Sequence, residues 1–195
     1  MNPLPAADKR SLRNEALARR GAVGADVRAL FSARLAKFGL EMAQRLHASA
    51  VSAFYPIKDE PDTLALLRGL SEHGFRTMLP ITVARGAPLI FRQWRPGDPT
   101  SPGAMNIPEP PASAPTLDPD LMFVPLACFD RRGHRIGYGA GHYDRTLERL
   151  RANGGVTAVG VAYACAEVPA LPDEAHDQRL DYILTERELL DCRTA

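Results

Sequence analysis

The chain has few cysteines, and those it has are scattered. Cys128, Cys165 and Cys192 lie far apart among its 195 residues, and none has C-x-x-C spacing. An odd, dispersed set argues against a disulfide framework or a zinc knuckle and fits a reducing compartment. We therefore expect Cys128 and Cys165 to be small core residues.

Net charge and long apolar runs are also lacking. The net charge is +1, with 24 Lys and Arg against 23 Asp and Glu. This balance gives no bulk attraction to nucleic acid or to an anionic membrane, and no apolar run approaches the length that crosses a bilayer. The first residues, MNPLPAADKRSLR, lack the apolar core of a signal peptide. We expect a cytoplasmic protein without nucleic-acid or membrane partners, whose basic clusters mark local sites.

The composition and the apolar patterns of the chain indicate one globular α/β domain that spans residues 1–195. Hydrophobic residues make up 45% and charged residues 24%, which is ordinary for a protein with a sizeable core. Apolar spacing predicts N-terminal helices within 6–48 (6–20, and 24–48 with an interruption near Gly39), then helices at 63–72 and 142–153. Short apolar runs predict strands at 50–55, 77–83, 89–94, 121–128, 156–163 and 180–185.

Strands that alternate with helices imply a three-layer α/β/α fold around a largely parallel sheet. Ligands of such sheets bind beyond the carboxyl ends of the strands. Proline dominates 95–119, and we interpret this segment as a surface loop of the same domain.

The most informative segment is Phe129–Arg145, which reads FDRRGHRIGYGAGHYDR. Gly137, Gly139 and Gly141 alternate in it between an apolar strand and a helix. Glycines let backbone amides approach an anion, and the first helical turn points free N–H groups at it. The spacing matches neither Walker A nor the dinucleotide fingerprint, so on glycine spacing alone a tight turn and a phosphate site are equally open.

Charged residues near this loop leave similar alternatives. Arg135 and Arg145 flank the loop with positive charge, and Asp144 is either a hard oxygen ligand for Mg²⁺ or a partner of the positive helix end. Lys9 and Arg13 are four residues apart and share one helical face. Composition alone favours a solvated basic face for them.

A longer pattern, VPLACFDRRGHRIGYGAGHYDRTL, closely resembles the signature of the 5-formyltetrahydrofolate cyclo-ligase (methenyltetrahydrofolate synthetase) family. The resemblance spans nearly the whole chain and keeps the family's order: KRSLR at 9–13, FYPIKDEPDT at 54–63, then LIFRQWRPGD, NIPEP and GVAYACAEVPALPDEAHDQRLDYILTE. It implies a fold similar to that of sugar-phosphate isomerases and CoA transferases. It also implies ATP-dependent conversion of 5-formyltetrahydrofolate to 5,10-methenyltetrahydrofolate by phosphoryl activation of the formyl oxygen, with release of ADP and phosphate.

The resemblance further implies a role for each site residue. The cations that contact the ATP phosphates and support catalysis are Lys9, Arg13 and Arg135. The loop that binds ATP comprises Gly137, Tyr138, Gly139, Ala140, Gly141, His142 and Tyr143. The folate contacts are Tyr55, Glu60, Tyr138 and His142, with Glu60 accepting hydrogen bonds from the pterin. Mg²⁺ is held by Asp144 and Asp177. Without the resemblance, Glu60 is an ordinary loop acid and Asp177 a turn residue.

Three positions depart from the family pattern. His142 stands where most members have tyrosine, Ala140 where many have lysine, and Ala166 where many have glutamine. Two other classes remain: another phosphate-binding enzyme of isomerase or CoA-transferase type, and a catalytically altered folate-binding or RNA-associated relative. Because the three cations and both aspartates occur together, we favour the cyclo-ligase, acting as a monomer on 5-formyltetrahydrofolate with or without a polyglutamate tail.

Overall fold

The computed structural model describes residues 8–172 and 174–194. Its α-helices are α1 (Lys9–Gly21), α2 (Ala25–Arg45), α3 (Leu64–Glu72) and α4 (His142–Ala152). The expected helix start at residues 6–7 lies outside the described residues. Among those residues, no helix is both long and apolar enough to cross a membrane.

One seven-stranded sheet forms the centre of the molecule, in the order β11-β10-β9-β6-β1-β2-β3. Its strands are β1 (Ala50–Ser52), β2 (Arg76–Ile81), β3 (Ile90–Gln93), β6 (Leu121–Pro125), β9 (Thr157–Val161), β10 (Tyr182–Leu184) and β11 (Leu189–Asp191). The five inner strands are parallel, whereas β3 and β11 pair antiparallel at the two edges. The predicted largely parallel sheet is confirmed, and β11 is an additional strand.

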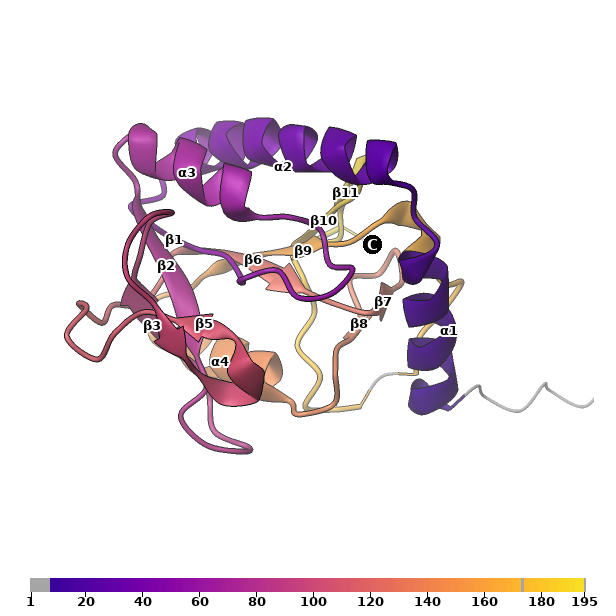
Figure 1. The fold of residues 1–195 in the computed structure, drawn as a ribbon. Coiled ribbons are helices and arrows are strands. Elements are labelled where there is room, and N and C mark those ends of the chain that lie inside the picture. Colours follow the sequence, from indigo (N-terminus) through magenta and orange to yellow (C-terminus); the bar gives the residue numbers. More distant parts are fainter. Residues whose placement is uncertain (1–7, 173, 195) are drawn as a thin grey trace, which may run out of the picture.

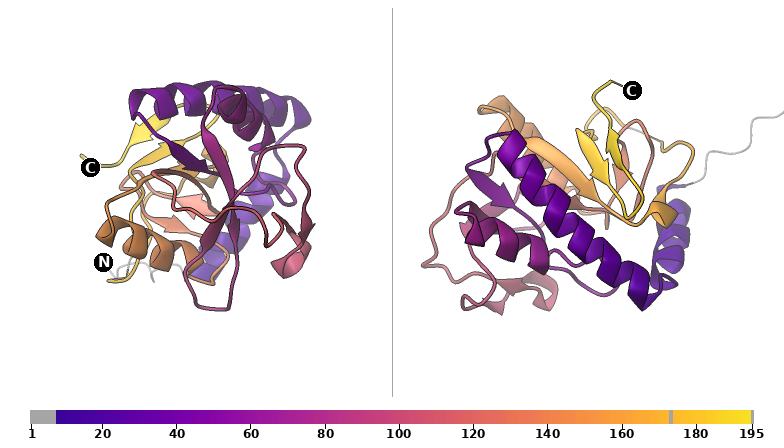
Figure 2. Two further views of the ribbon diagram at one scale, coloured as in Figure 1. Left: turned by 90° about the vertical axis from the view of Figure 1, so that its left-hand side faces the viewer. Right: turned by 90° about the horizontal axis from the view of Figure 1, so that it is seen from above.

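Helices cover both faces of this sheet (Figures 1 and 2). Alternate residues of the central strand β6 enter different cores: Leu121 and Phe123 pack with α2 and α3, and Met122 and Val124 pack with α4. A strand buried on both faces reads as a continuous apolar run. This arrangement confirms the three-layer α/β/α architecture.

Helix α2 runs without a break through Gly39, so the predicted interruption there is wrong. Gly39 is buried, and a Cβ at this position would come within 2.3 Å of Leu66 Cδ1 and 3.1 Å of Phe123 Cζ. The glycine allows α2 to approach α3 and the sheet closely. It does not end the helix.

The predicted strand 121–128 is divided by a change of direction after Pro125. Its end, β7 (Cys128–Phe129), pairs antiparallel with β8 (Arg135–Ile136) in a separate two-stranded ribbon. Helix α1 packs on this ribbon through Leu12 and Ala16. Cys128 is buried in the same contact, as expected, and burial raises the pKa of its thiol to about 11. The ribbon holds α1 beside the carboxyl ends of the strands.

The proline-rich segment is more structured than a loop. Residues 101–109 form a hairpin of β4 (Ser101–Pro102) and β5 (Pro108–Glu109), joined through the short 3₁₀ turn η1 (Ala104–Asn106). Met105 and Asn106 both have positive φ, at 55° and 60°, which few non-glycine residues adopt. The hairpin crosses in front of the sheet near β2 (Figure 1).

Candidate active site

A cavity of about 750 Å³ lies beyond the carboxyl ends of the parallel strands, where the topology predicts a ligand site. Its walls come from α1, the segment after β1, the end of β2 and the residues after it, the β4–β5 hairpin, the glycine loop with the start of α4, and the turn at 174–177. Each site residue predicted from the sequence lines this cavity: Lys9, Arg13, Tyr55, Glu60, Arg135, Gly137, Tyr138, Gly139, Ala140, Gly141, His142, Tyr143, Asp144 and Asp177. The structure therefore brings the whole predicted set together.

The glycine loop presents backbone amides to the cavity. Gly139 and Gly141 have φ of +96° and +65°, a conformation that side-chain-bearing residues rarely adopt. Gly141 is also the N-cap of α4, and no side chain caps this helix end. The amides of the first turn of α4 are consequently available to an anion. This geometry favours the phosphate site over the plain turn.

Two cations of α1 reach this loop and its surroundings. Arg13 Nε donates a 2.7 Å hydrogen bond to the carbonyl of Gly137. Lys9 Nζ lies 2.8 Å from Asp177 Oδ2 and 3.0 Å from Glu174 Oε1. Burial alone would lower the pKa of Lys9, but these two carboxylates outweigh burial and hold it above its usual value. The basic face of α1 is therefore turned toward the cavity and is not simply solvated.

Arg135 lies deeper in the wall, and its side chain is only 5% exposed. It donates to Asp144 Oδ1 at 2.8 Å and also to the carbonyl of Gln178. The amide of Gln178 donates to the same Asp144 oxygen at 3.1 Å. Asp144 thus fixes Arg135 and connects to the segment that carries Asp177.

The two aspartates fit a magnesium ion shared with a ligand. No group of three or more His, Cys, Asp or Glu side chains able to hold a metal occurs among residues 8–172 and 174–194. However, Mg²⁺ is usually bound by one or two carboxylates together with substrate phosphates. Asp144 and Asp177 both face the cavity and are linked through Gln178. The donor set suits Mg²⁺ bound with a polyphosphate, not a metal held by protein alone.

Glu60, in the wall formed by the segment after β1, is only 8% exposed. Its Oε1 accepts a hydrogen bond from the Tyr138 hydroxyl at 3.0 Å, and its Oε2 accepts one from the Ile57 amide at 3.1 Å. Burial raises the pKa of Glu60 above its usual value, although the Ile57 amide opposes this effect. Tyr55 stands beside Glu60 in the wall and packs edge-on against Trp94, with ring centroids 6.2 Å apart.

The departures from the family pattern have identifiable surroundings. The ring of His142 is 2.8 Å, through Nδ1, from the carbonyl of Ala87. Arg145 Nη1 donates to the carbonyl of Ala140 at 3.0 Å. A positive charge therefore lies next to the position where many family members carry lysine. Ala166 is buried in the core and does not line the cavity.

Sequence reasoning missed several cavity residues. Arg85 follows β2, Glu174 precedes Asp177, and Met105, Ile107 and Glu109 come from the hairpin. The NIPEP motif pointed to the hairpin, but its prolines favoured a surface loop. Arg85 carries no local signal, because an arginine in an exposed turn is ordinary.

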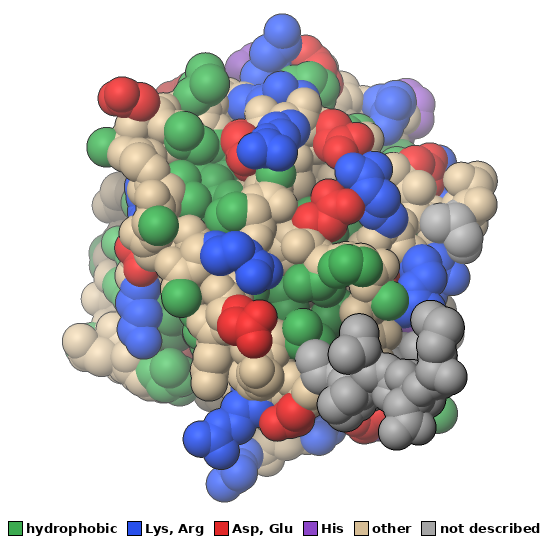
Figure 3. Space-filling view, turned by 90° about the vertical axis from the view of Figure 1, so that its right-hand side faces the viewer, with side chains coloured by type: hydrophobic (Ala, Val, Ile, Leu, Met, Phe, Trp, Pro, Cys, Tyr) green, Lys and Arg blue, Asp and Glu red, His purple; other side chains and the backbone are tan. Residues whose placement is uncertain are grey.

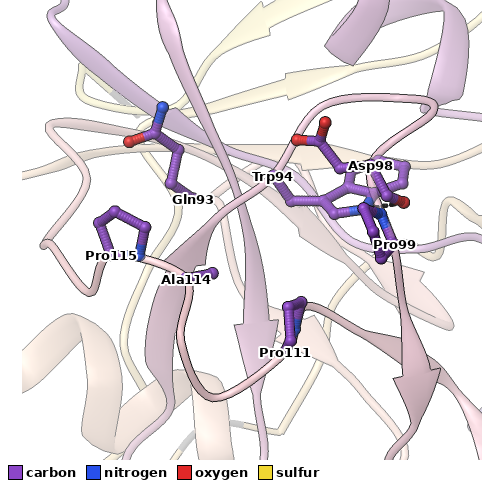
Figure 4. A pocket seen from close by; sticks show the side chains of 7 residues that line it. All are labelled: Gln93, Trp94, Asp98, Pro99, Pro111, Ala114 and Pro115. Carbon is purple, nitrogen blue, oxygen red and sulfur yellow. Dashed lines mark hydrogen bonds between the residues drawn. The ribbon is translucent and has the colours of Figure 1, made fainter.

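A second, smaller cavity of about 230 Å³ lies beside the proline-rich segment. Figure 4 shows Trp94, Asp98 and Pro99 on one side of it and Pro111, Ala114 and Pro115 on the other. The indole N–H of Trp94 donates to the carbonyl of Asp98 at 3.2 Å. The lining carries no cation, so this cavity offers nothing to a phosphate.

Fold and site together define an α/β protein with a cavity lined by a glycine loop at a helix N-terminus, by flanking cations and by a buried acid. A sequence model described as the 5-formyltetrahydrofolate cyclo-ligase family matches residues 5–186, and the chain belongs to this family of ligases. It is 34% identical to 5-formyltetrahydrofolate cyclo-ligase of Mycolicibacterium smegmatis, over 72% of this chain and 75% of that one. It is 31% identical to the Haemophilus influenzae protein of the same name, over 74% and 80%.

A solved structure agrees with this assignment. The structure of 5,10-methenyltetrahydrofolate synthetase from Aquifex aeolicus superposes with a TM-score of 0.76 at 27% identity, covering 95% of this chain and 93% of that one. The fold and the family expected from the sequence are therefore confirmed.

Proposed function

We propose that this cavity converts 5-formyltetrahydrofolate to 5,10-methenyltetrahydrofolate, using ATP and releasing ADP and phosphate. The observation that carries the proposal is the meeting, in one cavity, of the α1 cations, the glycine-loop amides and the buried Glu60. A polyphosphate suits the first two groups, and a flat heterocycle with N–H donors suits the third.

The reaction requires activation of an oxygen that leaves poorly. The γ-phosphoryl group of ATP is transferred to the formyl oxygen, which forms one P–O bond as the bond to ADP breaks. The neighbouring folate nitrogen then attacks the activated carbon and gives up its proton. The C–O bond breaks as phosphate leaves with that proton, and the ring closes. No protein nucleophile takes part, so the protein acts by positioning and electrostatics.

In this proposal Lys9, Arg13 and Arg135 stabilise the phosphoryl group, and the glycine-loop amides hold the rest of the polyphosphate. A preorganised donor at a site of developing charge contributes on the order of 3 kcal/mol. Arg135 is already fixed by Asp144, and Arg13 by the carbonyl of Gly137, so little reorganisation is needed. Mg²⁺ held by Asp144 and Asp177 would neutralise additional phosphate charge.

At the other end of the cavity we propose that Glu60 receives the pterin. A carboxylate can accept two parallel hydrogen bonds from adjacent N–H groups. Tyr55, Tyr138 and His142, which all line the cavity, would add flat contacts around the ring. We also propose that the protein is a cytoplasmic monomer, and its near-zero net charge gives no bulk attraction to nucleic acid or to an anionic membrane. Figure 3 shows cationic and anionic side chains interspersed on the face that carries α1.

The test is to mix the purified protein with 5-formyltetrahydrofolate, Mg²⁺ and ATP and to follow the absorbance of the methenyl product. We expect product only when ATP is present, with one ADP formed per turnover, because phosphoryl transfer precedes ring closure. Replacing ATP by ADP is the control. Product without ATP would contradict phosphoryl activation, and no product under any of these conditions would contradict the proposed function.

A further inference from the structure

Arg20, at the carboxyl-terminal end of α1, is a buried arginine that does not line the cavity. It is only 3% exposed. Its Nη2 donates to the Tyr138 hydroxyl at 2.8 Å, and its guanidinium carbon lies 5.9 Å from the centroid of the Tyr138 ring. Among the described residues, its Nε and Nη1 are buried with no hydrogen-bond partner. The arginine is therefore held at one point, by the tyrosine that contacts Glu60.

Such an arginine is not explained by stability. Burying a guanidinium with two unsatisfied N–H groups is unfavourable, and an apolar side chain of similar length would fill the same space at lower cost. A nearby group of opposite charge is the carboxylate of Glu60, to which Arg20 is connected through the Tyr138 hydroxyl. The position of Arg20 thus makes physical sense in relation to Glu60.

Hydrogen-bond direction strengthens this link. Arginine only donates, whereas a tyrosine hydroxyl has one hydrogen. With Arg20 donating to it, the Tyr138 hydroxyl accepts from that side and directs its hydrogen to Glu60 Oε1. The Ile57 amide fixes Oε2, so the carboxylate is held at both oxygens and each keeps a lone pair for another donor.

We propose that Arg20 is a positioning residue for the folate, which acts through Tyr138 to fix the orientation and the negative charge of Glu60. The proposal rests on the proposed function, since it takes Glu60 as the group that receives the pterin. The helical spacing supports it: Lys9, Arg13 and Arg20 lie at intervals of four and seven residues, on one face of α1. The same face of α1 would then serve both substrates.

Because Arg20 and Glu60 carry opposite charges, the proposal predicts how the pH dependence of the reaction changes when Arg20 is replaced. The groups that face Glu60 are Arg20 from α1, Tyr138 from the glycine loop, Tyr143 from α4 and Lys58 on its own turn. Burial raises the pKa of Glu60, while the Ile57 amide, Arg20, Tyr138 and Lys58 lower it. Removing Arg20 would raise this pKa further, and less of the carboxylate would be ionised at a given pH.

The experiment compares Arg20→Met and Tyr138→Phe with Arg10→Met, which changes an exposed arginine on the same helix. We expect Arg20→Met and Tyr138→Phe to raise the KM for 5-formyltetrahydrofolate roughly tenfold, as for one lost charge-assisted contact. In Arg20→Met the KM for ATP should stay unchanged, because Arg20 does not line the cavity. The acid limb of kcat/KM for the folate should move to higher pH in Arg20→Met and return toward its original position in Arg20→Lys.

A purely structural role predicts a different result: lower stability with an unshifted pH profile and equal changes for both substrates. That outcome, or wild-type folate kinetics in a folded Arg20→Met, would overturn the inference. Should Arg20→Met fail to fold, Tyr138→Phe is the deciding variant. Tyr138 is 41% exposed, and this substitution removes only its hydroxyl oxygen, so the fold should tolerate it. If the wild-type protein makes no product, the proposed function fails separately, and calorimetric binding of 5-formyltetrahydrofolate to the same variants still tests Arg20.

Discussion

At the scale of single residues, two cations of the cavity, Lys9 and Arg135, are already paired with carboxylates. Lys9 contacts Asp177 and Glu174, and Arg135 contacts Asp144. Such pairs hold long side chains in one orientation before any ligand arrives, which lowers the entropy lost on binding. An incoming polyphosphate would therefore share these cations with the aspartates, and a divalent cation at the aspartates would relieve that competition.

The two aspartates give the prediction at this scale. As Mg²⁺ ligands, Asp144→Asn and Asp177→Asn should each raise the Mg²⁺ concentration needed for half-maximal rate and lower turnover. If Asp144 only balances the helix dipole, its replacement should cost at most about 1 kcal/mol of stability and leave the Mg²⁺ dependence unchanged. Titrating Mg²⁺ against rate separates the two.

Asp118→Asn is the matched control. Asp118 also pairs with an arginine, Arg149, at 2.7 Å, but it is half-exposed and lies outside the cavity lining. Its replacement should leave the titration unaltered. Superimposable curves for all three variants would leave Asp144 as a helix-dipole partner and remove Asp177 from the metal site.

Through the family resemblance, the sequence pointed to many of the residues that line the cavity, but it did not indicate how they pair. Lys9 and Asp177 are 168 positions apart, and nothing local to either indicates the other. Gly139 and Gly141 were identifiable because their positive φ angles favour glycine. Arg20 was not, since it adjoins Arg19 in a basic helix and only tertiary packing decides which of the two is buried.

At the scale of elements, the close contact between α2 and α3 depends on Gly39, which has no Cβ. Gly39→Ala gains up to about 1 kcal/mol of helix propensity. It also places a methyl group against Leu66, which is fully buried. Overpacking of this kind typically costs about 1–3 kcal/mol. We expect a net loss in the free energy of unfolding, measured by urea denaturation.

Gly69→Ala provides the comparison. Gly69 is in the interior of α3, and a Cβ there meets no atom within 4 Å. The same substitution should therefore stabilise the protein by roughly 0.5–1 kcal/mol. Equal effects at the two glycines would show that the close approach at Gly39 is not limiting.

The error at Gly39 also shows where sequence patterns reach their limit. A glycine inside a helical pattern looks the same whether it ends the helix or accommodates a neighbour, and only the position of Leu66 distinguishes them. Likewise, the apolar run 121–128 continues past Pro125, although the strand ends there and Cys128 enters a different sheet. Apolar spacing identified the core segments but did not show where they turn.

At the scale of the molecule, one cavity joins distant parts of the chain, so each substrate should stabilise the whole fold. A ligand at about 100 times its Kd adds about 2.7 kcal/mol. In a chain of this size, that corresponds to a rise in Tm of roughly 5–10 °C. We expect 5-formyltetrahydrofolate and ATP to raise Tm separately in differential scanning calorimetry.

Glu60→Gln tests whether the two ends of the cavity are distinct. Because Glu60 is placed at the folate end, this variant should lose most of the folate-induced shift and keep the shift caused by ATP. Equal loss of both shifts would contradict the assignment of the two ends.

The way α1 is anchored has a consequence for synthesis on the ribosome. Its hydrogen bonds from Lys9, Arg13, Arg19 and Arg20 reach Asp177, Gly137, Cys165 and Tyr138, at sequence separations of 118 to 168 residues. At typical translation rates, roughly 6–30 s pass between the synthesis of α1 and that of these partners. Helix α1 therefore cannot form these contacts until the later strands of the sheet and the segments after them have been synthesised. The face that carries Lys9, Arg13 and Arg20 is made first and becomes part of the cavity last.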